Sequence, residues 1–190
     1  MIGEMEDIVM DVYRAIKERR SIRRYKDEDV PLDVLEKCLN AARLSPTGAN
    51  LQPLKYMTVT QNLEKIFGCT NWAGYLDWNP SKEEMPRAYI AILKEEDTGQ
   101  DLDVGIAAQS ICVTAKSEGL GTCILGALDV ERLEEMLQVP EDYELKLMVA
   151  LGYPDERPEV VEDSEKVEYY LEEDELKVPK KPLEEVWIQR

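Results

Sequence analysis

The sequence predicts an α+β fold in a single domain, and three observations support this prediction. Segments with apolar residues at helical spacing alternate along the chain with short apolar runs that are typical of buried strands. The 190 residues are 44% hydrophobic, which is enough to build one sizeable core. No apolar run reaches the roughly 18 residues that a membrane-spanning helix needs. We therefore expect residues 1–190 to form one domain that does not enter a membrane.

The composition excludes several classes of protein. The chain has no histidine, which excludes Ser-His-Asp and Cys-His catalysis and histidine-containing zinc sites, and no metal site is expected. The formal net charge of −17 argues against nucleic acid as a partner, because there is no broad basic surface. The four cysteines are widely spaced, and the acidic N-terminus lacks the apolar stretch of a signal peptide. A cytoplasmic protein with reduced thiols is expected.

The first expected element is a helix over residues 6–18, in which five apolar residues recur at helical spacing. The next eight residues hold five cations and no acid. If they are extended, Arg19, Ser21 and Arg23 share one face and the intervening side chains share the other. Two guanidiniums beside a hydroxyl suit a phosphate and a second electron-rich group. The same cations could instead only complement the dipole at the end of the helix.

A second helix is expected to begin near Pro31, which fits a first helical turn, and to stop by Ser45, which precedes a proline. The loop that follows, residues 45–53, is rich in Pro, Gly and Asn and in groups that can hydrogen-bond a heterocycle. It could equally be a plain connection to the short strand expected over residues 55–60. Its candidate binding residues are Pro46, Thr47, Gly48, Asn50 and Gln52.

The middle of the chain is predicted to supply two buried strands, residues 88–93 and 145–151, and two helices, residues 101–118 and 129–138. The longer helix carries a stripe of small residues, which suits close packing in its own core or against a partner. Residues 119–126 read as a helix cap followed by a strand that ends in glycine, either a plain strand end or a close approach to a planar ligand.

Residues 61–87 are expected to be helical and then irregular. Their clustered aromatic residues either pack a core or shape a substrate pocket, and they are Trp72, Tyr75 and Trp78.

Residues 155–175 hold eleven acidic residues against only Arg157 and Lys166. Residues 167–171 and 176–178 could pair as a hairpin across an acidic turn. A solvated acidic flap over about residues 155–178 is expected, followed by a tail over residues 179–190; a dock for a basic partner is the alternative.

Two of these motifs together carry a resemblance to a known family. The run from Arg19 to Tyr25 reads R-R-S-I-R-R-Y, and S-P-T-G-A-N-L-Q-P follows about two dozen residues later. The pair resembles the nitroreductase family of FMN-dependent oxidoreductases. The resemblance implies an α-β-α sandwich whose central, mostly antiparallel sheet is flanked by helices. It also implies a homodimer with FMN at the interface and a C-terminal strand or tail that extends to the partner subunit.

The resemblance also implies roles for individual residues in binding FMN. Arg19 and Lys180, or else Lys181, would hold the phosphate with Arg20 beside them. Ser21 would bond the ribityl or phosphate region, and Arg23 would sit at the pyrimidine edge. The candidate residues of the 45–53 loop would come from the other subunit. The strand segment expected behind the isoalloxazine ring is Ile124, Leu125 and Gly126, with the amides of the last two near N5 and O4.

The implied activity is the reduction of nitroaromatic, quinone or related electron-poor acceptors with NADH or NADPH by a ping-pong mechanism. The family's other activities remain open, namely dehalogenation, enone reduction and flavin fragmentation. A flavin-binding or regulatory protein with little turnover is the alternative from another class.

Overall fold

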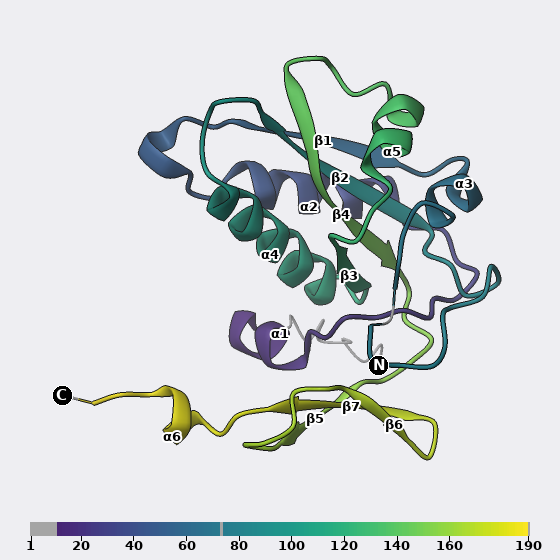
Figure 1. Cartoon of the computed structure of the whole chain (residues 1–190), viewed down its shortest axis with the longest axis vertical. Helices are drawn as coiled ribbons and strands as arrows, with labels where there is room; N and C mark the ends of the chain where they lie inside the picture. Colours follow the sequence, from purple (N-terminus) through teal and green to yellow (C-terminus); the bar gives the residue numbers. More distant parts are fainter. Residues whose placement is uncertain (1–10, 73, 190) are drawn as a thin grey trace, which may run out of the picture.

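A four-stranded antiparallel sheet forms the centre of the computed structural model, which describes residues 11–72 and 74–189 (Figure 1). The strand order is β1-β2-β4-β3. The two inner strands are buried on both faces, which explains why residues 88–93 read as one continuous apolar run. The strands are β1 (Leu54–Val59), β2 (Ala88–Glu95), β3 (Gly121–Leu125) and β4 (Tyr143–Gly152).

Helices cover both faces of this sheet. On one face, α2 (Leu32–Arg43) and α4 (Asp101–Ser117) pack in one core cluster with Ile90 and Ile92 of β2. On the other face, α3 (Leu63–Phe67) and α5 (Val130–Leu137) pack in a second cluster with Tyr89 and Ala91. Successive residues of β2 therefore feed opposite cores, as the two-residue repeat of a strand requires. The predicted sandwich of an antiparallel sheet between helices is confirmed.

Most predicted boundaries agree with the structure to within two residues. Pro31 directly precedes α2, and Ser45 lies just beyond the helix, as the proline signals indicated. Asp129 caps α5 by accepting a hydrogen bond from the backbone N–H of Arg132. The glycine-rich turn after α4 leads into β3, as predicted.

The first helix differs in its packing. Within the described residues α1 spans Val12–Glu18, and residues 6–10 of the predicted helix lie outside them. Only Ala15 is buried; Val12 and Ile16 are exposed. Within residues 12–18, the apolar residues at helical spacing therefore do not form a buried stripe.

The acidic segment folds into a second sheet below α1 in the view of Figure 1. Its strands are β5 (Glu159–Glu162), β6 (Tyr170–Glu172) and β7 (Glu175–Lys180), in the order β5-β7-β6. The predicted hairpin is confirmed, because β6 pairs antiparallel with β7. In addition, β5 pairs parallel with β7, a long-range pairing that no local pattern indicated.

The C-terminal tail, for which the resemblance implied a strand or an extension to the partner subunit, forms a short helix in this chain, α6 (Leu183–Val186). Pro182 precedes this helix, and Glu184 and Glu185 lie in its first turn, where negative charge favours helix formation. Between residues 11 and 189, residue 73 aside, no helix is long and apolar enough to cross a membrane.

Candidate functional site

The arginine run lies along the free edge of β3. Ser21 forms an isolated parallel bridge with Thr122, and the backbone N–H of Ile22 donates to the Thr122 carbonyl at 2.9 Å. The Ile22 side chain packs directly on Gly121, where a Cβ would lie 2.7 Å from Ile22 Cγ1. Only glycine at this position lets the run approach the strand so closely. The bridge places Ser21 alongside the first half of β3.

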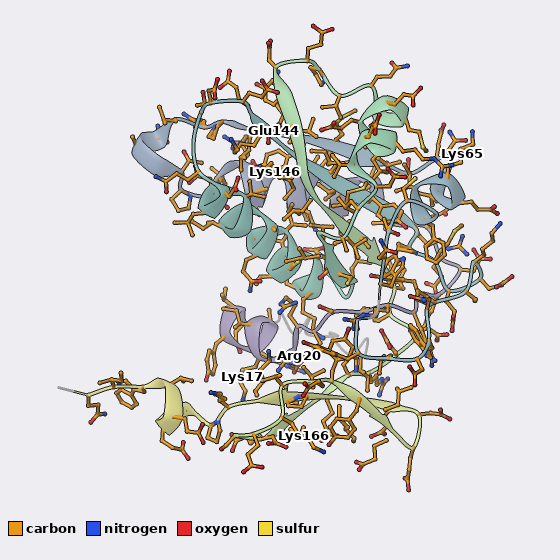
Figure 2. The ribbon with its side chains drawn as sticks, in the orientation of Figure 1. Lys17, Arg20, Lys65, Glu144, Lys146 and Lys166 are labelled. Carbon is orange, nitrogen blue, oxygen red and sulfur yellow. The ribbon has the colours of Figure 1, made fainter. Side chains whose placement is uncertain are left out.

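A cavity of about 900 Å³ opens between α1, the start of β3 and residues 154–160. Six cations and three acids line it, in a chain whose net charge is strongly negative. Figure 2 shows the side chains of Lys17 and Arg20 in the space between α1 and the C-terminal sheet. The cationic lining consists of Arg14, Lys17, Arg19, Arg20, Lys116 and Arg157.

Arg19 and Arg20 line this cavity, and only part of their donors is satisfied: Nη1 of Arg20 donates to the Arg19 carbonyl. The Nε of each is buried without a hydrogen-bond partner. Among residues 11–72 and 74–189, no ion pair involves either side chain. Burial, and then the neighbouring Arg19 guanidinium, lower the pKa of Arg20 from its ordinary value. Unpaired guanidinium donors at a cavity of this size fit a phosphate-bearing ligand.

Arg19 is the C-cap residue of α1, and its backbone is already extended, with φ −65° and ψ 126°. Arg19, Arg20 and Ile22 line the cavity, whereas Ser21 and Arg23 do not.

Arg23 points elsewhere and is buried, with 8% of its surface exposed. Its Nε donates to the Trp72 carbonyl at 3.3 Å, and its guanidinium carbon lies 4.5 Å from the centre of the Tyr169 ring. Trp72 is buried in the core, whereas Tyr75 is exposed. The aromatic cluster therefore serves both packing and the surroundings of Arg23.

Glu156 closes the cavity beside the arginine run. Its Oε1 accepts hydrogen bonds from the backbone N–H groups of Arg23 and, at 3.3 Å, of Arg24. Burial raises the pKa of Glu156, although the two backbone donors oppose this shift. The expectation that the acidic segment is simply solvated is wrong at this residue. No sequence signal distinguishes it from the other ten acids of the segment.

The end of β3 presents main chain beside the run. Ile124 is 41% exposed, Leu125 is buried and Gly126 is exposed. A Cβ built at Gly126 would meet nothing within 4 Å, so this glycine leaves open space next to the backbone. Ser21 pairs with Thr122 near the start of this strand, and residues 124–126 form its other end.

The 45–53 loop lies at the opposite end of α4. Gly48 N–H donates to Oδ1 of the buried Asp103 at 3.0 Å, and Ser45 and Ser110 share a hydroxyl–hydroxyl bond of 2.7 Å. The cavity instead reaches Lys116, thirteen residues further along the same helix, so the two motifs are about 20 Å apart along α4. One chain does not bring them together.

The exposure of this loop suits contact with another molecule. Pro46, Asn50 and Gln52 are exposed, and Thr47 and Gly48 are half-buried. Asn50 and Gln52 adopt φ values of 56° and 53°, a backbone region that ordinary residues seldom occupy. A short helical turn, η1 (Gly48–Asn50), fixes this shape.

Lys180 and Lys181 are exposed and do not line the cavity. Lys180 is the last residue of β7, and its carbonyl accepts from the backbone N–H of Asp163 at 3.0 Å. Within one chain, the structure does not bring these lysines to Arg19. Lys177 of the same strand is buried and pairs with Glu159 and Glu175 at 2.6 and 2.7 Å.

All four cysteines are free and buried. Burial raises the pKa of Cys38 to about 12 and that of Cys123 to about 11. Neither thiol is a nucleophile near neutral pH. The site's chemistry must therefore come from a bound group and the charges around it.

Comparison with known proteins identifies the family. Residues 16–96 and 93–153 match the model described as the nitroreductase family. A protein of Methanothermobacter thermautotrophicus, whose name assigns it as an NADH dehydrogenase/NAD(P)H nitroreductase, is 32% identical, with 78% of this chain and 80% of that protein covered. The iodotyrosine deiodinase of Thermotoga neapolitana is 25% identical, with 76% and 89% covered. The solved FMN-dependent nitroreductase of Clostridium difficile R20291 is 28% identical, with a TM-score of 0.62 and 75% and 87% covered. The chain therefore belongs to the nitroreductase family.

Proposed function

We propose that the protein is an FMN-dependent oxidoreductase that uses NADH or NADPH to reduce nitroaromatic, quinone or related electron-poor acceptors. Membership of the family and the names of its relatives support this activity. The observation that carries it is the cavity of about 900 Å³ lined by Arg19 and Arg20, each of which has an unpartnered Nε. When bound, FMN supplies the hydride and electron transfer.

The residues of the chain bind and orient this cofactor. Arg19 and Arg20 hold its phosphate, because charge-assisted hydrogen bonds satisfy the donors that are otherwise orphaned. Ser21 bonds the ribityl region, and Arg23 sits at the pyrimidine edge, where a cation stabilises the negative charge of the reduced ring. The main chain at Ile124, Leu125 and Gly126 lies behind the ring, where the exposed glycine permits close approach.

The working unit of this proposal is a homodimer. The 45–53 loop lies about 20 Å from the arginines along α4, so Pro46, Thr47, Gly48, Asn50 and Gln52 reach the cofactor of the other subunit. A homodimer would also cover large apolar side chains that are exposed in the monomer. They lie on α1 and on the C-terminal tail and are Val12, Tyr13, Ile16, Leu183, Val186, Trp187 and Ile188.

The tail extends to the partner in this arrangement. The edge strand β1 borders a shallow groove whose apolar part suits the apolar side chains of the tail. The groove is lined by Leu39, Leu54 and Tyr56 together with Glu36, Asn40, Arg43 and Lys55. With the tail moved, Lys180 or Lys181 reaches the phosphate that Arg19 holds. Removal of residues 182–190 should then convert the dimer to monomer, as measured by light scattering; a dimer that persists would contradict tail exchange.

We place the protein in the cytoplasm, where its four free thiols remain reduced. NAD(P)H and the acceptor use the same open face in turn, which gives ping-pong kinetics. The test is steady-state oxidation of NADH and NADPH with a nitroarene and with a quinone. We expect parallel lines in double-reciprocal plots. Protein stripped of FMN should turn over only when FMN is added. Intersecting lines, or turnover without FMN, would contradict the mechanism.

A second candidate reaction is dehalogenation, because one relative, 25% identical in sequence, is named an iodotyrosine deiodinase. Release of iodide from an iodinated phenol by the reduced protein would favour it. Nitroarene reduction without iodide release would favour the first reaction.

A further inference from the structure

Tyr169 reaches from the acidic segment to the arginine run. It lies between β5 and β6, beyond residue 153, where the match to the family model ends. Its ring centre is 4.5 Å from the Arg23 guanidinium carbon, and its hydroxyl accepts from the backbone N–H of Gly74 at 2.9 Å. The Tyr75 ring meets the Tyr169 ring edge-on at 5.1 Å between centres. Three contacts therefore fix this one side chain.

Tyr169 is an uncharged aromatic residue within a strongly acidic segment. Residues 155–175 hold eleven acids, yet the group that packs on Arg23 is an aromatic ring. A carboxylate there would pair with the guanidinium and cancel its field. An aromatic ring attracts the cation through its quadrupole and carries no net charge. The contact therefore holds Arg23 in place without adding a negative charge beside its guanidinium.

The Arg23 side chain is also not neutralised by its remaining contacts. Its Nε donates to the Trp72 carbonyl, a neutral acceptor, and no ion pair within residues 11–72 and 74–189 involves its side chain. The Glu156 carboxylate is close, but it accepts from the backbone N–H of Arg23. Arg24, by contrast, pairs with Glu84 at 3.3 Å.

We propose that Tyr169 is a positioning residue that fixes the Arg23 guanidinium without neutralising it, and so favours the binding of reduced over oxidised FMN. The proposal rests on the proposed function, which places Arg23 at the pyrimidine edge. It assigns to the acidic sheet a role in setting the potential of the cofactor.

The test compares four variants of the full-length protein. Tyr169→Leu removes the ring, Tyr169→Phe keeps the ring without the hydroxyl, and Tyr169→Glu places a carboxylate on Arg23. Tyr170→Leu is the matched control, because Tyr170 is a half-buried aromatic of the same sheet whose recorded cation partner is Lys166. For each variant, the Kd of oxidised and of chemically reduced FMN is measured anaerobically.

The informative quantity is the ratio of the reduced-FMN Kd to the oxidised-FMN Kd. Tyr169→Leu should raise this ratio by about 2- to 30-fold, the range of one cation–π contact. A tenfold rise corresponds to a midpoint potential lower by about 30 mV for a two-electron couple. Tyr169→Glu should raise the ratio at least as much, whereas Tyr169→Phe and Tyr170→Leu should stay within about twofold of the wild type.

An unchanged ratio in Tyr169→Leu would overturn the proposal, as would an equal change in the Tyr170→Leu control. If Tyr169→Leu does not fold, the phenylalanine variant decides the question. A large rise in its ratio would assign the effect to the hydroxyl and refute the role of the ring. Wild-type protein that binds no FMN would instead refute the proposed function.

Discussion

Replacement of Arg20 by methionine should weaken FMN binding and, at the same time, stabilise the protein without FMN. Arg20 brings a buried, unpartnered Nε to the cavity, and burial lowers its pKa. Methionine retains much of the volume and removes both the charge and the orphaned donor. The two effects therefore have opposite signs, which a merely structural role of Arg20 would not produce.

The expected magnitudes follow from the contacts. A hydrogen bond from a charged donor to phosphate is worth roughly 1.5–3 kcal/mol, so the Kd for FMN should rise by about 10- to 150-fold. An unsatisfied buried donor costs on the order of 1 kcal/mol, so the free energy of unfolding of the apoprotein should rise by up to about that amount. The melting temperature of the apoprotein would then rise by roughly 2–4 °C.

Two measurements check this prediction: FMN fluorescence titration at several salt concentrations, and thermal unfolding of the stripped protein. Lys26→Met is the matched control, because Lys26 is an exposed cation of the same run that does not line the cavity. Its FMN affinity should stay within about twofold of the wild type. Unchanged FMN affinity in Arg20→Met would refute the phosphate site, and a destabilised apoprotein would refute the uncompensated charge.

Three further predictions concern the supports of the site. Gly121→Ala places a Cβ 2.7 Å from Ile22 Cγ1 and should lower the free energy of unfolding by about 1–3 kcal/mol in urea denaturation. Combining it with Ile22→Ala should relieve part of this loss. Fully additive effects of the two substitutions would refute the clash. Burial raises the pKa of Glu156 above 4.5. The folded state therefore keeps the proton of this carboxyl group to a higher pH than the unfolded state does. The contribution of Glu156 to stability consequently falls as the pH rises through the folded-state pKa. The wild type should therefore lose stability relative to Glu156→Gln between pH 4 and pH 8; a constant difference would contradict the shift. The four buried thiols should resist a disulfide reagent at pH 8 until the protein is unfolded, and rapid labelling of the native protein would show that the core opens.

Local signals predicted those parts of the fold that local physics decides. Proline fixed both limits of α2, because Pro31 suits a first turn and Pro46 disfavours helix at Ser45. The continuous apolar run of β2 predicted a strand buried on both faces. The resemblance carried by the two motifs also predicted the antiparallel sheet between helices, which the pattern of each segment alone does not give.

The features that were missed depend on long-range contacts. Glu156 and Tyr169 both turn inward to the arginine run, although the composition of their segment indicates a solvated surface. Nothing local marks which of the acids is buried or which of two adjacent tyrosines meets Arg23. The α6 turn was also not predicted, although Pro182 before it and the two acids in its first turn are local signals that start a helix.

The most direct test of the account is the visible spectrum of the purified protein under anaerobic conditions, before and after addition of NADH and then NADPH. The account predicts a flavin spectrum that one or both nucleotides bleach, and that returns when a nitroarene or quinone is added. A protein that neither retains nor rebinds FMN, or a bound flavin that both nucleotides leave oxidised, would contradict it.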